Sequence, residues 1–164
     1  MDKETTLAVL RQHGIPFELY EHEAITTMEE ASAVHLPCAA DEAKNLFVRD
    51  DKKRNYYLIT VKGDKRVDLK QFRKEHGTRV LSFASAEDLQ AKLKLDPGSV
   101  TPLGLLNDES GSVILYLDEA FLEGNAMIGV HPNDNTATVH LKTDNLIRLL
   151  EKHGTQVNLI PISQ

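Results

Sequence analysis

Apolar residues in this chain occur only in short runs, separated by glycine, proline and charged residues, and this pattern most constrains the fold. No run approaches the ~20 apolar residues that a membrane-spanning helix requires. Runs with helical and strand spacing are interspersed along the 164 residues without strict strand–helix–strand alternation. The pattern therefore predicts a mixed α/β fold rather than a doubly wound parallel sheet, and the length fits a single domain over residues 1–164.

The spacing of apolar residues, together with caps and stops, predicts the individual elements. Helices are expected at residues 3–13, 26–35, 69–76, 86–93 and 143–153, with Asp68, Ser85 and Thr143–Asp144 as capping residues. Strands are expected at residues 15–20, 45–49, 56–61, 80–83, 113–117, 126–130, 136–141 and, at a sheet edge, 157–162. The polar turn 50–55 makes a hairpin of the second and third strands, and residues 96–104 form a loop rich in glycine and proline.

Charge is distributed unevenly along the chain, although its formal net value is −6. Residues 44–79 contain twelve basic and five acidic residues, a net charge of +7, whereas the other 128 residues carry −13. Such a basic block is either a solvated face or a surface that binds a phosphate backbone. Its aromatic residues Phe47, Tyr57 and Phe72 lie in apolar patterns and are expected in the core.

Familiar catalytic signatures are missing from the sequence, including a phosphate-binding loop, a nucleophile elbow and a His-Glu-x-x-His zinc motif. His131 and His140 flank one turn, but two histidines without a third ligand make a poor metal site. We expect neither a metal nor another cofactor. The single cysteine, Cys38, cannot form an internal disulfide, which fits a cytoplasmic protein, and we expect it to be a small buried residue rather than a nucleophile.

Three segments occur together in a distinctive order: Lys44-Asn45-Leu46-Phe47, Gly98-Ser99-Val100-Thr101-Pro102 and Gly129-Val130-His131-Pro132-Asn133. In this combination the chain resembles the YbaK/ProX family of aminoacyl-tRNA deacylases, related to the editing domain of bacterial prolyl-tRNA synthetases. The resemblance extends over nearly the whole chain and is strongest to the ProX branch, which hydrolyses alanyl-tRNA(Pro). It implies a single YbaK-like domain with a central, mixed, partly barrel-like β-sheet and surrounding helices.

The resemblance also implies chemistry: a water molecule hydrolyses the ester between an amino acid and the terminal adenosine of tRNA. Lys44 would anchor the phosphate or ribose, Asn45 would orient the water or the substrate amine, and the segment starting at Gly98 would stabilise the oxyanion. His131 would position the substrate rather than act as general base. The pocket residues implied are Ser99, Val100, Thr101, Pro102, Gly129 and Val130. Each of these residues could instead have an ordinary structural role.

For the tRNA-binding surface we expect basic residues of the block, namely Lys52, Lys53, Arg54, Lys65 and Arg66. The implied partner is mischarged tRNA(Pro), with prolyl-tRNA synthetase or an elongation factor as a further partner, and neither a membrane nor DNA. Three alternatives stay open: a deacylase for another amino acid such as cysteine, a non-catalytic tRNA-binding module, and a small-molecule binder. A tRNA-binding module would show steep salt dependence without turnover.

Overall fold

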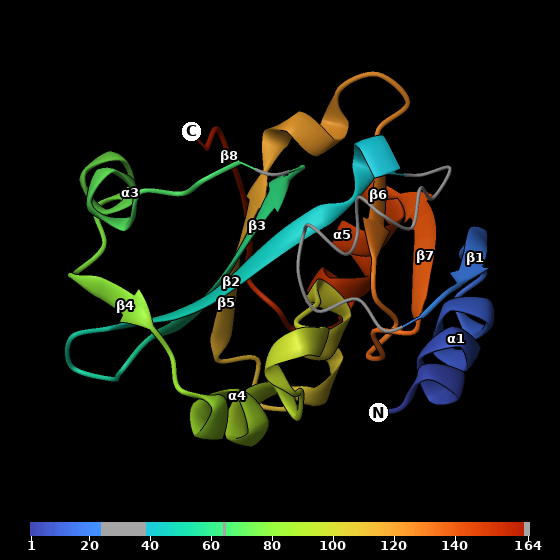
Figure 1. Ribbon diagram of the computed structural model, residues 1–164, viewed down its shortest axis with the longest axis horizontal. Helices are drawn as coiled ribbons and strands as arrows, with labels where there is room; N and C mark the ends of the chain where they lie inside the picture. Colours follow the sequence, from blue (N-terminus) through green and yellow to red (C-terminus); the bar gives the residue numbers. More distant parts are fainter. Residues whose placement is uncertain (24–38, 64, 163–164) are drawn as a thin grey trace.

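A computed structural model of the chain describes residues 1–23, 39–63 and 65–162 and contains two β-sheets with helices packed around them (Figure 1). The predicted helix at 26–35 and Cys38 lie outside the described residues. The mixed α/β fold class is confirmed. The described strands form two sheets and no closed barrel. The expected partly barrel-like β-sheet therefore describes this arrangement only loosely.

The larger sheet has five strands in the order β4-β2-β3-β5-β8. Its strands are β2 (Ala43–Asp50), β3 (Tyr56–Lys62), β4 (Leu81–Phe83), β5 (Val113–Asp118) and β8 (Val157–Ile160). The predicted hairpin of β2 and β3 is confirmed, with the turn between Asp50 and Tyr56. Strands β5 and β8 join in parallel, which makes the sheet mixed and places β8 at its edge as predicted.

The smaller sheet has three antiparallel strands in the order β1-β7-β6. Its strands are β1 (Phe17–Glu21), β6 (Met127–Val130) and β7 (Ala137–Lys142). A single bridge between Glu42 and Gly129 connects the start of β2 to β6. Glu42, two residues before Lys44, therefore lies beside β6 of the smaller sheet.

The main hydrophobic core contains residues from both sheets, such as Leu58 and Leu115 of the larger and Ile128 and Leu141 of the smaller. In the described part of the chain, the helices around the sheets are α1 (Lys3–Gln12), α3 (Leu69–His76), α4 (Ala86–Leu93) and α5 (Thr143–His153). Buried leucines of α1, α4 and α5 extend the main core. Phe72 of α3 instead packs in a second cluster on the opposite face of the larger sheet. In Figure 1, α3 and β4 lie at the opposite end of the molecule from α1 and β1.

Local predictions were mostly confirmed, with two corrections. Asp68 and Ser85 cap α3 and α4 as expected, and Phe47, Tyr57 and Phe72 are buried. The expected cap of α5 is wrong: Lys142 occupies the N-cap position without a side-chain hydrogen bond, because the hydroxyl of the buried Thr143 donates to the carbonyl of Phe121. The expected loop at 96–104 contains the 3₁₀ turn η2 (Pro97–Ser99) and the start of η3 (Pro102–Asn107). Two further 3₁₀ segments, η1 (Ala39–Asp41) and η4 (Glu119–Leu122), lie elsewhere in the described part of the chain.

Candidate active site

Hydrogen bonds between side chains and backbone bring the three motif segments together. The Nδ2 of Asn45 donates to the carbonyl of Val100 at 3.2 Å. The hydroxyl of Thr101 donates to the carbonyl of His131 at 2.6 Å. Segments separated by more than fifty and by thirty residues therefore form one structural unit.

Lys44, next to Asn45 in β2, is a half-buried lysine whose ammonium has no partner among the described residues. The structure describes five half-buried lysines: Lys3, Lys44, Lys62, Lys65 and Lys92. Three of them form ion pairs with carboxylates, and Lys92 lies over the ring of Tyr56. Among the described residues, Lys44 has neither an ion pair nor a hydrogen bond to its ammonium. Partly burying a charge without a partner costs free energy. Such uncompensated groups are typical of binding and catalytic sites.

Asn45 points to the face of the sheet opposite Lys44, because side chains alternate along a strand and β2 pairs regularly from Ala43 to Arg49. Both ends of its amide are occupied. Its Oδ1 accepts a hydrogen bond from the hydroxyl of Thr60 at 2.7 Å, and its Nδ2 is held by Val100. The amide is therefore built into the site as a connection between β2, β3 and the 97–101 segment.

The segment from Gly98 to Pro102 is partly committed to its own turns. The N–H of Ser99 donates to the carbonyl of Asp96, and that of Leu103 to the hydroxyl of Thr101. Among the described residues no partner is found for the amides of Gly98, Val100 and Thr101, which makes them the candidates for stabilising an oxyanion. Gly98, Ser99 and Val100 are half exposed, whereas Thr101 and Pro102 are buried.

The second half of the site belongs to β6 and the turn after it. Gly129 and Val130 are buried, and Val130 packs in the main core, whereas His131 is half exposed. A Cβ atom on Gly129 would lie 3.5 Å from atoms of Glu42 and of Thr138, which is ordinary van der Waals contact, so the approach of these segments does not require a glycine here. Of these three residues, His131 is the one that a substrate could reach with its side chain.

His131 is held as a neutral ring with a defined tautomer. Its Nδ1 lies 2.9 Å from the carbonyl oxygen of Ala137, and a carbonyl can only accept, so Nδ1 carries the proton. Burial lowers the pKa of His131, against the opposing effect of that hydrogen bond. Nε2 is consequently an unprotonated acceptor at neutral pH. The ring of His22 lies 6.3 Å away, and its own Nε2 is within 2.9 Å of the hydroxyl of Thr138.

Two residues of this unit were missed by sequence reasoning, Glu42 and Thr60. Burial raises the pKa of the half-buried Glu42, whose carboxylate has no hydrogen bond or ion pair among the described residues. Thr60 is fully buried and lies opposite Asn45 on the neighbouring strand β3. Glu42 could have been suspected because it precedes Lys44 by two positions. Nothing in the sequence distinguishes Thr60 from other strand threonines.

Metal binding has no support in the part of the chain that the structure describes, where no three His, Cys, Asp or Glu side chains could hold an ion. His140, considered above with His131, lies 2.9 Å from a carboxylate oxygen of Asp41 through its Nε2. Asp41 also lies 3.7 Å from the ammonium of Lys62. His140 therefore belongs to a polar cluster with Asp41 and Lys62.

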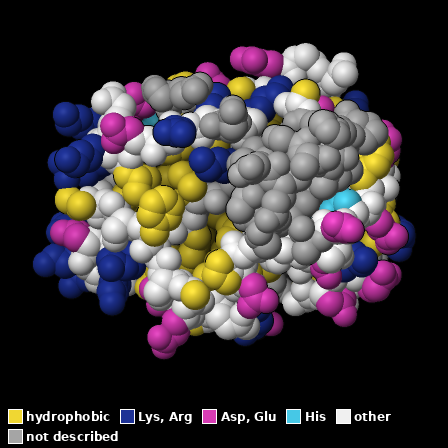
Figure 2. Space-filling model, viewed as in Figure 1, with side chains coloured by type: hydrophobic (Ala, Val, Ile, Leu, Met, Phe, Trp, Pro, Cys, Tyr) yellow, Lys and Arg dark blue, Asp and Glu magenta, His cyan; other side chains and the backbone are white. Residues whose placement is uncertain are grey.

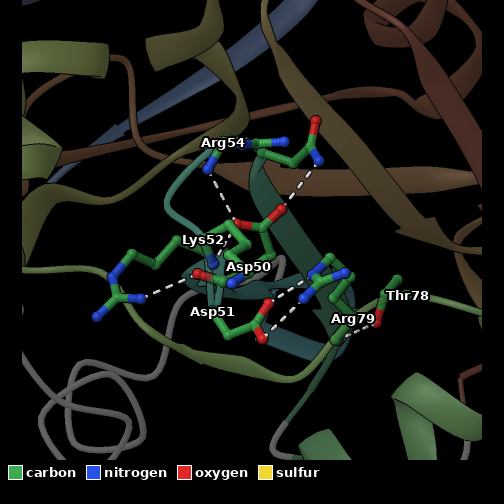
Figure 3. A network of polar contacts seen from close by, with 8 residues as sticks. Asp50, Asp51, Lys52, Arg54, Thr78 and Arg79 are labelled. Atoms are coloured by element: carbon green, nitrogen blue, oxygen red, sulfur yellow. Dashed lines mark hydrogen bonds and ion pairs between the residues drawn. The ribbon is translucent and has the colours of Figure 1, made fainter.

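The basic residues at the tip of the β2–β3 hairpin are organised by two aspartates (Figure 3). Asp50, only 1% exposed, accepts hydrogen bonds from the backbone of Lys52 and Arg54 and from the side chain of Asn55. Although burial opposes it, these hydrogen bonds lower the pKa of Asp50. Asp51 forms a two-point ion pair with Arg79, at 2.6 and 3.0 Å. The turn thus leaves Lys52, Lys53 and Arg54 exposed at its tip.

Figure 2 shows Lys and Arg side chains gathered on the side of the molecule that carries α3, β4 and this turn. Arg66 is exposed as well. Lys65 differs from the other expected tRNA-binding residues, because its ammonium lies 2.6 Å from the buried carboxylate of Asp118. Its charge is balanced by Asp118, unlike the charges of the exposed residues at the hairpin tip, and its role in binding tRNA stays a prediction.

The fold, the half-buried Lys44 and the connected motif segments fit one class of protein, the aminoacyl-tRNA editing domains. The sequence pattern of the aminoacyl-tRNA editing domain matches residues 22–149, and the chain belongs to this family. It is 38% identical to the prolyl-tRNA editing protein ProX of Acetoanaerobium sticklandii over 160 residues, covering 98% of this chain and 97% of that protein. The family resemblance inferred from the sequence is thereby confirmed.

Animal proteins and solved structures are similar to the chain as well. It is 36% identical over 144 residues to the prolyl-tRNA synthetase associated domain-containing protein 1 of Mus musculus, covering 86% of this chain and 85% of that protein. The crystal structure of a candidate trans-editing enzyme for prolyl-tRNA synthetase superposes with a TM-score of 0.72 at 23% identity, covering 100% of this chain and 98% of that one. This last similarity concerns the fold.

None of the helices in the described part is both long and apolar enough to cross a membrane.

Proposed function

We propose that the protein is a trans-editing hydrolase that cleaves the ester bond of mischarged tRNA(Pro), with alanyl-tRNA(Pro) as its main substrate. Membership of the aminoacyl-tRNA editing family and similarity to a prolyl-tRNA editing protein support the reaction class. The observation that carries the proposal is the half-buried ammonium of Lys44, which lacks a partner among the described residues. A phosphate or ribose oxygen of the terminal adenosine would supply that partner.

In this proposal the site aligns and stabilises, and water is the nucleophile. Lys44 anchors the terminal nucleotide, and an amide of Gly98, Val100 or Thr101 donates to the oxyanion that forms when water attacks the carbonyl. The neutral Nε2 of His131 accepts a hydrogen bond from the substrate and thereby positions it. The ribose hydroxyl beside the ester assists the attack. No protein group is required to form a covalent intermediate.

Selection of alanine follows from the size of the second pocket. A synthetase that binds proline discriminates poorly against a smaller amino acid, since each missing methylene costs only about 1–3 kcal/mol. An editing pocket sized for a methyl group excludes proline by steric clash and so spares correctly charged tRNA. The half-exposed Val100 and the region around Gly129 are the small apolar elements that we assign to this pocket.

The tRNA body would contact the exposed hairpin tip through Lys52, Lys53 and Arg54, with Arg66 as a further basic residue. These side chains carry charge without ion pairs among the described residues, whereas Lys65 and Arg79 are paired. Prolyl-tRNA synthetase or an elongation factor would deliver the charged tRNA.

A deacylation panel tests the proposal. Purified protein is incubated with Ala-, Cys-, Ser- and Pro-tRNA(Pro), and release of the amino acid is measured. We expect hydrolysis of the alanyl ester and survival of the prolyl ester, and a loss of at least ~100-fold in kcat/KM for Lys44→Ala. Lys94→Ala, at an exposed lysine outside the motifs, is the control.

Each result of the panel has a definite meaning. Preference for the cysteinyl ester would assign the chain to another specificity within the same reaction class. Salt-sensitive tRNA binding without release of any amino acid would show a binding module and overturn the proposal. Equal activity of Lys44→Ala and Lys94→Ala would remove Lys44 from the site.

A further inference from the structure

Thr60 of β3 is a fully buried residue outside the three motif segments that is hydrogen-bonded to the candidate site. It lies directly opposite Asn45 in the β2–β3 pairing, and its hydroxyl donates to Asn45 Oδ1 at 2.7 Å. The opposite end of the same amide donates to the carbonyl of Val100 at 3.2 Å. Thr60 thus contacts the 97–101 segment through one intermediate side chain.

The hydroxyl of Thr60 and the carbonyl of Val100 together hold the Asn45 amide in one orientation. An asparagine amide has an acceptor end and a donor end of nearly the same shape, and its neighbours decide the orientation. The carbonyl of Val100 can only accept, so it takes the NH₂ group, and the hydroxyl of Thr60 donates to the oxygen at the other end. Without that hydroxyl, Asn45 Oδ1 loses its buried partner and the amide is held at one end only.

The orientation of the Val100 carbonyl fixes a neighbouring donor. Val100 C=O and Thr101 N–H belong to one planar trans peptide, in which the two bonds point in opposite directions. Holding the carbonyl therefore aims the N–H, which is among the three amides assigned above to the oxyanion. The hydroxyl of Thr101, hydrogen-bonded to the carbonyl of His131 at 2.6 Å, fixes the far side of the same residue.

From this geometry we infer that Thr60 is a positioning residue for the editing reaction: through Asn45 it sets the plane of the Val100–Thr101 peptide and hence the direction of the Thr101 N–H. The inference rests on the proposed function, because it concerns the oxyanion of that reaction. It assigns a role to a buried strand residue that never touches the substrate.

The test compares Thr60→Val with Thr60→Ser. Valine keeps the shape of threonine and removes the hydroxyl, whereas serine keeps the hydroxyl and removes the methyl group. We expect Thr60→Val to lower kcat for deacylation about 10- to 100-fold with KM nearly unchanged, since misaimed donors cost rate rather than binding. Thr60→Ser should retain most of the wild-type kcat. Thr155→Val, at a buried threonine just before β8, is the matched control and should keep wild-type kcat.

Melting temperatures and amide NMR spectra complete the experiment. If kcat of the variants follows their melting temperatures, or if Thr60→Val and Thr60→Ser lose the same activity, the role is structural and the inference is wrong. The signals of the Asn45 side-chain NH₂ and of the Thr101 N–H should shift in Thr60→Val and return in Thr60→Ser. Unshifted signals would also overturn it. If these signals shift in Thr60→Val but the wild-type protein hydrolyses no charged tRNA, the proposed function is rejected and the positioning geometry stays intact.

Discussion

Charged residues at the two ends of strand β2 differ in their exposure and in their pairing. At its beginning, the ammonium of Lys44 and the carboxylate of Glu42 are half-buried and have no partner among the described residues. At its far end, Asp50 and Asp51 are fully engaged by hydrogen bonds and by Arg79, while the unpaired cations are exposed to solvent. Enclosed and unpaired charge is suited to gripping a small ligand group, whereas exposed charge is suited to long-range attraction of a polyanion.

This contrast separates two contributions to one activity. The half-buried charge should act on the chemical step, and its effect should depend less on salt because it is partly shielded from solvent. The exposed charge should act on association and should weaken as ionic strength rises. The predictions below test that separation.

The largest effect on association is expected from reversing the exposed charge. Changing Lys52, Lys53 and Arg54 together to Glu should raise KM for charged tRNA about 10- to 100-fold and leave kcat within about two-fold. Repulsion of phosphates replaces attraction, while the enclosed site is unaltered. Steady-state deacylation at several salt concentrations measures both quantities, and the salt dependence of KM should become shallower.

A control with the same change in net charge is available on the rest of the surface. Lys94, Lys142 and Lys152 are exposed lysines outside the basic block, and their joint change to Glu should leave KM close to wild type. Equal effects of the two triple variants would mean that total charge matters and the hairpin tip does not. In that case residues 44–79 would be an ordinary solvated face.

Much of the fold follows from local sequence, because the hairpin turn, the caps at Asp68 and Ser85 and the edge strand β8 depend on neighbouring residues. The cap of α5 was wrong because a distant carbonyl, that of Phe121, competes for the hydroxyl of Thr143. The same reason limits the site. The motifs indicate Lys44 and His131, but Thr60 and Glu42 gain their roles only from contacts with Asn45 and Gly129 that folding creates. The roles of the motif residues in catalysis stay predictions.

A smaller effect is expected from the aspartates that shape the hairpin tip. Asp50→Ala removes the acceptor of three hydrogen bonds inside the turn and should lower the melting temperature by roughly 5 °C. Asp51→Ala breaks an exposed ion pair and should lower it by less than about 2 °C. Thermal unfolding monitored by circular dichroism distinguishes the two. Similar shifts for both variants would show that the turn is not organised around Asp50.

The smallest effect concerns the enclosed carboxylate and has the opposite sign. Because burial raises the pKa of Glu42 in the folded protein above its usual value, the folded state favours the protonated form. Stability from this group is complete below the unfolded pKa and is lost as pH rises through the folded pKa. Replacing Glu42 with the uncharged Gln should therefore raise the melting temperature at pH 7 by about 1–3 °C and change it little at pH 4.

Glu87→Gln is the matched control, since Glu87 is an exposed residue in the first turn of α4, and it should give no such gain at pH 7. A gain for Glu42→Gln that is the same at both pH values would trace the effect to packing and not to charge. No gain at pH 7 would mean that the carboxylate is compensated in solution, and the contrast between enclosed and exposed charge would then rest on Lys44 alone. A gain confined to neutral pH would show that the protein gives up stability to keep a carboxylate beside Gly129, at the edge of the pocket proposed for the aminoacyl group.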